Sequence, residues 1–585
     1  MTLNRREMIA AAGAATALAP LPAFATVPSA MESVTDEWLT RNPTSATGLG
    51  IDKGVYASLR SRLEDTSPAA RADEARFLRE SLRKLAPVPG VDAEVTRFAF
   101  QTGLEGLQLP YGKVSIGGWQ NSPYTVIQNV GSYIGIPRFL DADHIVTTPD
   151  DAATWLARFS AWPKVLDGET QQLRMARGMG AIAPDFLLDK ALKQLGDVAA
   201  SAHSGVIAAN YAAKTSAMPG GWGDKAKRVA QGDVAAALDR QIAELRLHRV
   251  VAKADAGAWH LPDGDRYYAW ALKASTTTQL SPDEIHRVGL AQIEELHARM
   301  DAILRPLGYT QGSVGQRMVA VAKDPKVRFA DGDEGRAQIM AFIQERLRLI
   351  RAAMPRAFSP LVRGNVEVRR LPLAEEPGAA GAYGGAGSID GKIPGRFWIN
   401  LGVVSRHNRA SLPSLTHHEA IPGHVWQGEY AQQGSLIRAM LSFNAYNEGW
   451  GLYAEQLADE LGLYEGDPYG RLGYLQSMAF RAARLVADTG LHAKRWTRAQ
   501  TVQWFAEANG QDPSEVTSEV ERYCSWPGQA CGYKVGHNEI NRLRAEAKAK
   551  MGGKFDLRTF NTAVVQGGNV PLPVLGEIVA RYERT

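Results

Sequence analysis

Apolar residues recur at three- and four-residue spacing over seven long stretches, and this pattern limits the fold more than any other feature of the sequence. The spacing gathers apolar side chains on one face of an α-helix, which must then pack against other elements. Several stretches begin with helix-capping signals, such as Ser281-Pro282-Asp283-Glu284. We therefore expect a mainly α protein. The predicted helices are Ala69–Leu85, Asp150–Trp162, Gly168–Met179, Pro184–Leu195, Asp233–Ala252, Ser281–Leu304 and Gly335–Met354.

Strand signals are sparse. The best candidates are Val366–Leu371 and Arg396–Leu401. The Gly- and Ala-rich stretch between them, Pro377–Gly391, is predicted to be a loop. The sequence thus predicts a minor β element within a helical body.

The composition excludes several classes of protein. The 585 residues include 66 Lys and Arg against 62 Asp and Glu, which is a formal net charge of +4, and 45% of them are hydrophobic. These globular values exclude disordered, collagen-like and disulfide-stapled chains. No basic block points to nucleic acid, and no run of 18 uncharged apolar residues predicts a membrane span. No repeat or linker divides residues 26–585, so we expect a single domain there, with no sign of an obligate protein partner.

The first 25 residues have the pattern of an export signal. Arg5 and Arg6 precede an uncharged Ala- and Gly-rich stretch, Ile9–Leu21, and Ala23-Phe24-Ala25 offers small residues for signal cleavage. The arginine pair suggests the twin-arginine route. The alternative, a buried N-terminal helix, is disfavoured by two prolines near the end of the stretch. We expect a periplasmic or secreted protein after signal removal.

The two cysteines, Cys524 and Cys531, leave two alternatives open. On a straight helix they would be about 10.5 Å apart, too far for a disulfide, but Pro527-Gly528 interrupts any helix there. They are either a disulfide or two unpaired core thiols. Neither lies at a lipidation position after the signal, so a lipoprotein is not expected. Two cysteines cannot build a thiolate zinc cluster, so a metal would need His and carboxylate ligands.

The segment Ser414–Gln427 is the one that indicates chemistry. His417, His418 and His424 are three of the chain's twelve histidines, and Glu419 follows His418 directly. In the H-E-x-x-H metalloprotease pattern, two histidines one helical turn apart bind zinc and the glutamate is the general base. Here the second histidine comes two residues late. The alternative to a metal site is a polar helix cap with surface histidines.

Helical geometry determines what this delay means. On an unbroken helix, His418 and His424 would point about 120° apart, and His417 and His424 would be about 10.5 Å apart. Neither pair could share a metal ion. Pro422-Gly423 can distort the backbone, because proline lacks an N–H donor and glycine tolerates strained dihedrals. We expect about two residues to bulge out of the helix and return His424 to a position beside His418.

A second helical segment, Asn444–Asp459, offers a third ligand. Catalytic zinc takes three protein ligands and keeps one position open for water. Glu448 follows His424 by 24 residues, a distance that suits a helix, a turn and an antiparallel helix. Glu455 lies two turns further along the same face. It is either an ordinary solvated acid or a carboxylate that holds a ligand imidazole.

These residues resemble the gluzincin metallopeptidases. His417-His418-Glu419, Gly423-His424 and Glu448 are similar to the His-Glu-x-Gly-His motif and distal glutamate of angiotensin-converting-enzyme-like, thimet-oligopeptidase-like and thermostable-carboxypeptidase-like enzymes. The Pro-Gly insertion resembles more specifically a large bacterial family known only as domain of unknown function 885. Further similar stretches, which together cover nearly the whole mature chain, are Ala258–Gly264, Asp390–Gly395, Glu448–Trp450, Arg484–His492, Pro527–Ala530, Tyr533–Gly536 and Gly567–Leu572.

The resemblance implies a fold and a metal site. The fold would be a large multi-helix, two-lobed body around a deep cleft, with a small β-sheet beside the metal-site helix. One Zn²⁺ per chain would be held by His418, His424 and Glu448, with Glu419 as the general base. Arg396–Leu401 would be the edge strand on which a peptide substrate adds as an extra strand. That segment could equally be a core strand.

The resemblance also implies an activity. It points to an exported zinc-dependent hydrolase, a peptidase that cleaves short peptides with a metal-activated water. Tyr533 or His492 would donate to the developing oxyanion, although either could be an ordinary core residue. Two other functions stay open: a metallohydrolase of a non-peptide amide, and a non-catalytic periplasmic binding protein on the same fold. The presence of Glu419 argues against the second, because a binder needs no base.

Overall fold

The computed structural model describes residues 29–118, 120–371, 373, 376, 381–387 and 394–584. The predicted export signal at residues 1–25 lies outside them. The described chain is mainly helical, as the sequence predicts. Its first part contains α1 (Ala30–Arg41), α2 (Pro43–Gly48), α3 (Pro68–Leu85), α4 (Val91–Leu107), α5 (Ser132–Ala142), α6 (Pro149–Gly178), α7 (Asp185–Ser204), α8 (Ala209–Lys214), α9 (Trp222–Val229), α10 (Ala235–Val251) and α11 (Gly264–Thr276).

The second part carries the remaining helices and the strands. The helices are α12 (Pro282–Leu304), α13 (Val314–Lys323), α14 (Gly332–Ala353), α15 (Leu412–Glu419), α16 (His424–Ala431), α17 (Leu436–Met440), α18 (Asn444–Glu460), α19 (Pro468–His492), α20 (Arg498–Asn509), α21 (Pro513–Ser525), α22 (Gln529–Met551), α23 (Leu557–Gly567) and α24 (Leu572–Tyr582). The strands are β1 (Val366–Arg370), β2 (Ala382–Gly385) and β3 (Gly395–Ile399).

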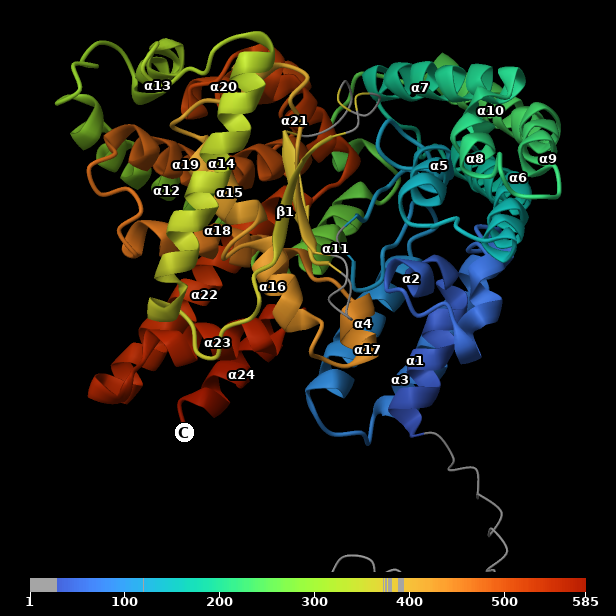
Figure 1. Cartoon of the computed structure of the whole chain (residues 1–585), viewed down its shortest axis with the longest axis horizontal. Helices are drawn as coiled ribbons and strands as arrows, with labels where there is room; N and C mark the ends of the chain where they lie inside the picture. The colour runs from blue at the N-terminus through green and yellow to red at the C-terminus, as the bar shows by residue number, and fades with distance from the viewer. Residues whose placement is uncertain are drawn as a thin grey trace, which may run out of the picture.

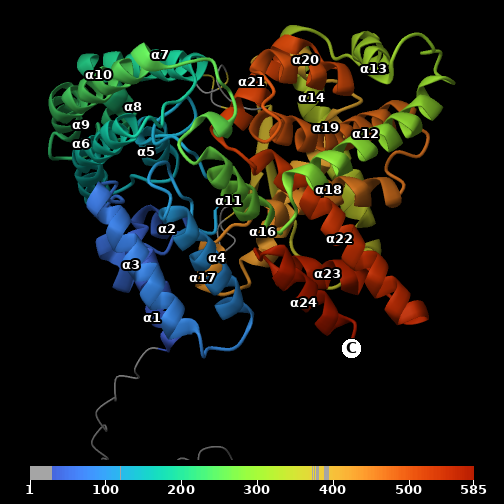
Figure 2. The same cartoon turned by 180° about the vertical axis from the view of Figure 1, so that it is seen from behind.

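The two parts of the chain lie on opposite sides of the molecule. In Figure 1, α1 to α10 occupy one side, and α12 to α24, apart from α17, occupy the other. The view from behind shows α11 between the two groups (Figure 2). α11 packs against both α4 and α22, and α17 packs against α4. These contacts join the two sides.

The predicted helices are present, but some are longer than predicted; α7, for example, continues past Leu195 to Ser204. Asp150–Trp162 and Gly168–Met179 belong to a single helix, α6, which continues through Pro163. Proline inside a helix costs about 3 kcal/mol or more. Trp162 and Leu166 beside it are fully buried, and each buried side chain of this size contributes about 1.5–3 kcal/mol. Tertiary packing therefore outweighs the local signal that suggests a break.

The sheet confirms both predicted strands and adds a third. β1 pairs with β3 in parallel, and β2 pairs with β3 in antiparallel orientation, so the order is β1-β3-β2. The prediction that all of Pro377–Gly391 is a loop is wrong, because β2 lies within it. The Gly-rich composition hid this short strand from a pattern-based prediction.

The strand order also corrects the predicted substrate edge. Arg396–Leu401 overlaps β3, which is the central strand and has no free edge. β2 is an edge strand instead, and it lies against the end of α15. A Cβ on Gly384 of β2 would be only 2.0 Å from the carbonyl oxygen of Glu419. The small sheet thus stands beside the metal-site helix, as expected, but through a different strand.

Glycines let α18 and α22 pack closely. A Cβ on Gly536 of α22 would lie 1.7 Å from the carbonyl oxygen of Ala445 of α18, and one on Gly449 would meet the backbone of Gly536. The two backbones are therefore in contact. This contact brings the faces that carry Glu448 and Tyr533 to the same region of the protein.

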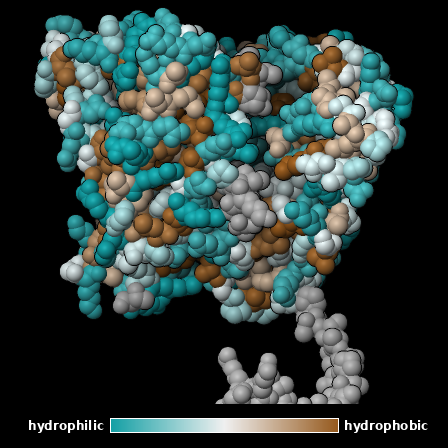
Figure 3. Space-filling view, viewed as in Figure 1, coloured by the Kyte–Doolittle hydropathy of each residue, from teal (hydrophilic) through white to brown (hydrophobic). Residues whose placement is uncertain are grey.

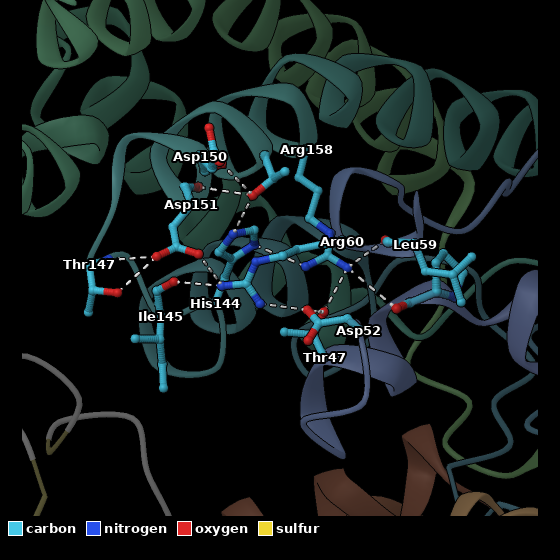
Figure 4. Close-up of polar contacts among 12 residues, drawn as sticks. Thr47, Asp52, Leu59, Arg60, His144, Ile145, Thr147, Asp150, Asp151 and Arg158 are labelled. Carbon is cyan, nitrogen blue, oxygen red and sulfur yellow. Dashed lines mark hydrogen bonds and ion pairs between the residues drawn. The ribbon is translucent and has the colours of Figure 1, made fainter. Parts of the chain in front are cut away.

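A buried arginine fastens the N-terminal segment to α6 (Figure 4). Arg158 is fully buried. Its guanidinium donates to the Leu59 carbonyl (3.0 Å), the Thr47 hydroxyl (2.9 Å) and Nδ1 of His144 (3.0 Å). Burial and the neighbouring Arg158 charge lower the pKa of His144 to about 4, so its imidazole is a neutral acceptor. Arg60 extends the network through two ion pairs with aspartates.

The surface and the cysteines bear on two further expectations. On the face shown in Figure 3, hydrophobic side chains are scattered in patches among hydrophilic ones. Within the described residues, no helix has the length and apolar character needed to cross a membrane. Cys524 and Cys531 are buried free thiols, so the structure has two unpaired core cysteines rather than a disulfide.

Candidate metal centre

His418 and His424 lie side by side, although two helices carry them rather than one. α15 ends at Glu419 and α16 begins at His424. The two imidazole rings are 4.9 Å apart between centroids and nearly perpendicular, at 87°. The predicted proximity is confirmed. The predicted two-residue insertion takes the form of a break between helices: the Trp426 N–H donates to the Ala420 carbonyl, six residues back instead of the usual four.

The inserted Pro422-Gly423 holds this break in place. Gly423 has a negative φ of −76°, so a left-handed backbone is not the reason for glycine there. A Cβ at this position would lie 1.8 Å from the carbonyl oxygen of His418. The indole N–H of Trp450 donates to the Pro422 carbonyl at 2.8 Å, which ties the connection to α18.

Glu448 on α18 completes a three-residue cluster. Its Oε2 lies 3.4 Å from Nε2 of His418 and 3.4 Å from Nε2 of His424. Zinc bonds of about 2.0–2.2 Å in a tetrahedron place neighbouring ligand atoms about 3.3–3.5 Å apart, so both His–Glu distances fit one zinc ion. The ligand atoms of all three residues lie within 4.8 Å of one another. Throughout the part of the chain that the structure describes, this is the one group of His, Cys, Asp and Glu side chains that could hold a metal. Two histidines and one glutamate are also the residue types of one known ligand set of catalytic zinc.

Glu455 supports His418 from behind. It is fully buried, which excludes the solvated acid and favours the other alternative. Its Oε1 accepts a hydrogen bond from Nδ1 of His418 at 2.8 Å, and its Oε2 accepts one from Ser414. With Nδ1 occupied, His418 presents Nε2 to the cluster.

The charges of the cluster are coupled. Burial by itself would lower the pKa of His418, but hydrogen bonds to Glu448 and Glu455 raise it to about 10. Burial opposes ionisation of Glu448, yet its contacts with His418 and His424 hold its pKa well below the usual range. Three carboxylates, including Glu419, therefore surround two imidazoles. Such a set of negative groups favours binding of a cation.

Glu419 lies beside the ligands and is not one of them. It is the last residue of α15 and is partly buried. Burial raises the pKa of its carboxyl, while the neighbouring His418 and His424 act in the opposite direction. A carboxylate with a raised pKa is a stronger base, so it is better suited to proton transfer near neutral pH.

A small cavity adjoins the cluster. Its volume is about 250 Å³, and its walls include His424, Glu448, Gln427, and Gly384 and Gly385 of β2. A larger hollow of about 470 Å³ lies between α5, α6 and α8 and is lined mostly by apolar side chains such as Trp155. The larger hollow contains no metal-binding cluster, so the chemistry is assigned to the smaller cavity.

Tyr533 and His492, the two predicted oxyanion donors, have different surroundings. The Tyr533 ring stacks on His418 with 6.4 Å between centroids and 17° between planes. His492 is buried, and both of its ring nitrogens bind backbone groups: Nδ1 accepts from the Ala258 N–H at 2.9 Å, and Nε2 donates to the Tyr523 carbonyl at 3.1 Å. The structure brings Tyr533 to the cluster. It leaves His492 no free nitrogen, so its expected catalytic role is unsupported.

His417 is also outside the cluster. Its Nδ1 lies 3.2 Å from the Ile421 carbonyl oxygen, and its ring edge faces Tyr464. Burial lowers its pKa to about 4. It is a core residue behind the break between α15 and α16.

Two features of the site escaped sequence reasoning. A Cβ on Gly451 would lie 2.5 Å from the His418 ring, so this glycine lets α18 approach the ligand. Arg481 and Arg484 lie close to the Tyr533 ring, with guanidinium carbons 5.9 and 4.3 Å from its centroid. The sequence signals that could have revealed these features were Gly451, three residues after Glu448, and Arg484, the first residue of the similar stretch Arg484–His492.

The helical fold and the His₂Glu cluster define a mainly α protein with a candidate metal centre. The sequence profile of a bacterial protein family of unknown function, DUF885, matches residues 43–579. The chain therefore belongs to the DUF885 family. No curated protein matches the chain.

Two solved structures share the fold. A protein from Colwellia psychrerythraea, provisionally described as a lipoprotein, is 31% identical with a TM-score of 0.88; the match covers 95% of this chain and 100% of that chain. A second, from Shewanella oneidensis, is provisionally described as a lipoprotein of unknown function. It is 18% identical with a TM-score of 0.65, and the match covers 94% of this chain and 99% of that one. At that identity the second shows the fold alone.

Proposed function

We propose that this protein is an exported zinc-dependent metallohydrolase, and specifically a peptidase of gluzincin type that cleaves short peptides. The observation that carries the proposal is the 3.4 Å spacing of Glu448 from both His418 and His424, with Glu419 directly beside them. A purely structural zinc site would have four protein ligands. This cluster has three, and a candidate base stands next to it.

His418, His424 and Glu448 would hold the ion. When bound, zinc supplies a Lewis acid that polarises a carbonyl and lowers the pKa of water. Other residues of the chain would orient these ligands. Glu455 fixes the tautomer and orientation of His418, and Trp450 and Gly423 keep the two histidines adjacent.

Glu419 would move the proton. Its carboxylate takes a proton from the attacking water as the new C–O bond forms at the scissile carbonyl. It then passes this proton to the amide nitrogen as the C–N bond breaks, so the carboxylate is regenerated. Tyr533, stacked on His418, is the candidate that donates a hydrogen bond to the carbonyl oxygen as negative charge develops there.

An extended substrate would lie along β2. This strand is the outer strand of the sheet among the described residues, and it lines the cavity beside His424 and Glu448. Backbone hydrogen bonds to a strand edge bind peptides with little dependence on side chains. A two-lobed body with a deep cleft, which the gluzincin resemblance implies, would admit short or unstructured peptides in preference to folded proteins.

The alternatives are a metallohydrolase that cleaves a non-peptide amide and a periplasmic binding protein without activity. Metal analysis of the purified protein, combined with hydrolysis of a mixed peptide library, separates them. We expect one zinc per chain and cleaved peptides. Zinc without cleavage of any peptide would favour the non-peptide amide, and failure to bind zinc would contradict the whole proposal.

A further inference from the structure

Arginines gather beside the metal centre around one tyrosine ring. The guanidinium carbon of Arg484 lies 4.3 Å from the centroid of the Tyr533 ring, and that of Arg481 lies 5.9 Å from it. The same ring stacks on His418. The Tyr533 ring therefore contacts both arginines and His418. Both arginines lie on α19, Tyr533 lies on α22 and His418 lies on α15.

A third arginine joins this group through a shared carboxylate. Nη2 of Arg484 lies 2.8 Å from Oε2 of Glu519, and Nη2 of Arg522 lies 3.6 Å from the same oxygen. Arg481 has no ion pair among the described residues. Its charge acts on Glu455, whose carboxylate is already bound to His418. Two of the three guanidinium groups thus share the Glu519 carboxylate, and the third, Arg481, has no carboxylate in ion-pair contact among the described residues.

Several hydrogen-bond donors of the arginine cluster also lack an acceptor. Three of its nitrogens are buried and have neither a hydrogen bond nor an ion pair among the residues that the structure describes: Arg481 Nε, Arg484 Nη1 and Arg522 Nε. A fourth, Arg522 Nη2, has only the 3.6 Å ion pair with Glu519. The Arg484 side chain is only 6% exposed. A buried cationic donor without an acceptor costs free energy. An anion that bound beside these arginines would accept their hydrogen bonds and remove that cost.

We propose that Arg481, Arg484 and Arg522 form an anion site that binds a carboxylate of the substrate. This inference rests on the hydrolase function proposed above and adds its substrate class, which is anionic. The planar guanidinium group matches a carboxylate with two parallel hydrogen bonds. The Arg522 side chain is 24% exposed, which gives the anion a path of approach.

The position of the cluster limits where the carboxylate lies in the substrate. Because Tyr533 contacts both Arg484 and His418, the anion site is close to the cleaved bond. An extended peptide spans about 3.3–3.6 Å per residue, so the carboxylate belongs to a residue within a few positions of that bond. It is either the C-terminal carboxylate or the side chain of Asp or Glu.

Binding to an inactive variant tests the site without any need for turnover. The protein is zinc-loaded Glu419→Gln, and the probes form two pairs of an acid and its neutral counterpart. The first pair, acetyl-Ala-Ala and its C-terminal amide, tests a C-terminal carboxylate. The second pair, acetyl-Ala-Glu-amide and acetyl-Ala-Gln-amide, tests a side-chain carboxylate. Calorimetry should show at least one acid probe binding about tenfold or more tightly than its neutral twin, since hydrogen bonds to charged groups are the strong ones. The pair that shows the difference identifies the source of the carboxylate.

Arginine variants then assign the effect. In Arg484→Gln and Arg522→Gln, each combined with Glu419→Gln, the acid-to-neutral ratio should fall towards one. Arg249→Gln is the matched control: it removes the same charge from an exposed pair with Asp189, and the ratio should stay as it was. If the buried Arg484 variant does not fold, the more exposed Arg522 variant carries the test.

Each outcome has a clear reading. Equal binding of acid and neutral probes overturns the anion site. A ratio that persists in both arginine variants also overturns it, because the carboxylate then binds the metal itself. Acid-selective binding that depends on the arginines supports the site, and if the native protein nevertheless hydrolyses no peptide, the peptidase function is wrong while the anion site stands.

Discussion

Nδ1 of His418 donates a hydrogen bond of 2.8 Å to Oε1 of Glu455, a carboxylate that is buried completely. The two residues come from different helices, α15 and α18. This bond turns Nε2 of His418 towards Glu448, which lies 3.4 Å away. A carboxylate outside the three-residue cluster therefore orients one histidine of that cluster.

Removing Glu455 should weaken zinc binding although all three ligands remain. Loss of such a supporting partner typically costs about 10–100-fold in metal affinity. We expect Glu455→Ala near the upper end and Glu455→Gln near the lower end, since the amide oxygen can still accept from Nδ1. Competition with a chromophoric chelator measures this, with Glu460→Gln on the same helix as the control. An unchanged affinity in Glu455→Ala would show that the bond does not orient His418.

The ligands themselves should determine zinc content. Elemental analysis of the native protein should find about one zinc per chain. His418→Ala, His424→Ala and Glu448→Gln should each lose most of it, because three ligands are the minimum set for a catalytic zinc. His417→Asn is the control and should retain zinc, since His417 binds the Ile421 carbonyl instead. Retention of zinc in His424→Ala would exclude His424 as the second ligand.

Glu419→Gln should separate catalysis from metal binding. The change keeps the shape of the side chain and removes the base. General-base catalysis is typically worth about 10²–10⁴-fold, so turnover of a peptide found in the library should fall at least about a hundredfold. Zinc content should stay at the native level, the reverse of the result for Glu448→Gln. A Glu419→Gln protein that loses zinc would mean that Glu419 is a ligand.

The break between α15 and α16 should tolerate no side chain at position 423. In Gly423→Ala, the new Cβ would lie 1.8 Å from the His418 carbonyl oxygen, and forced overpacking typically costs about 1–3 kcal/mol. Denaturant unfolding should show this loss together with weaker zinc binding. Gly576→Ala is the control, because its Cβ would meet only Leu543 at 3.8 Å. Deleting Pro422 and Gly423 should likewise damage folding, and a fully active deletion protein would show that the spacing is not structural.

The metal-free protein should lose stability as the pH falls from about 6.5 towards 4.5. Burial, reinforced by Arg158, lowers the pKa of His144 to about 4, and burial lowers that of His492 to about 3. In the unfolded chain both return to about 6.5, so the unfolded state binds more protons in this window and gains from acid. Each group contributes up to about 1.4 kcal/mol per pH unit.

Urea unfolding of chelator-treated protein at pH 6.5 and pH 4.5 measures this dependence. His144→Gln should show a shallower decline than the native chain, because one of the buried neutral imidazoles, which include His417 as well as His492, is gone. Equal stability of the native chain at both pH values would contradict the assignment of neutral, buried imidazoles.

The sequence determined the elements whose signals are local. Three-and-four spacing predicted the long helices, and a Ser281 capping box is present at the start of α12 as expected. The spacing of His418, His424 and Glu448, together with the resemblance to gluzincin motifs, nominated the cluster, and helical geometry predicted that the chain must be distorted between the two histidines. In each case the residues that determine the outcome lie close together in the chain.

Tertiary structure decided the rest, because those outcomes depend on which distant segments are buried against each other. Burial keeps α6 intact through Pro163, and pairing with β3 makes a strand of a glycine-rich stretch. The role of Glu455 depends on α18 packing on α15, and no local pattern distinguishes it from a surface acid. Arg484 and Arg522 are 38 positions apart in the sequence, yet they share one carboxylate. A charge acquires its partners only when the chain folds, so an unpaired cluster of this kind is visible in the tertiary structure alone.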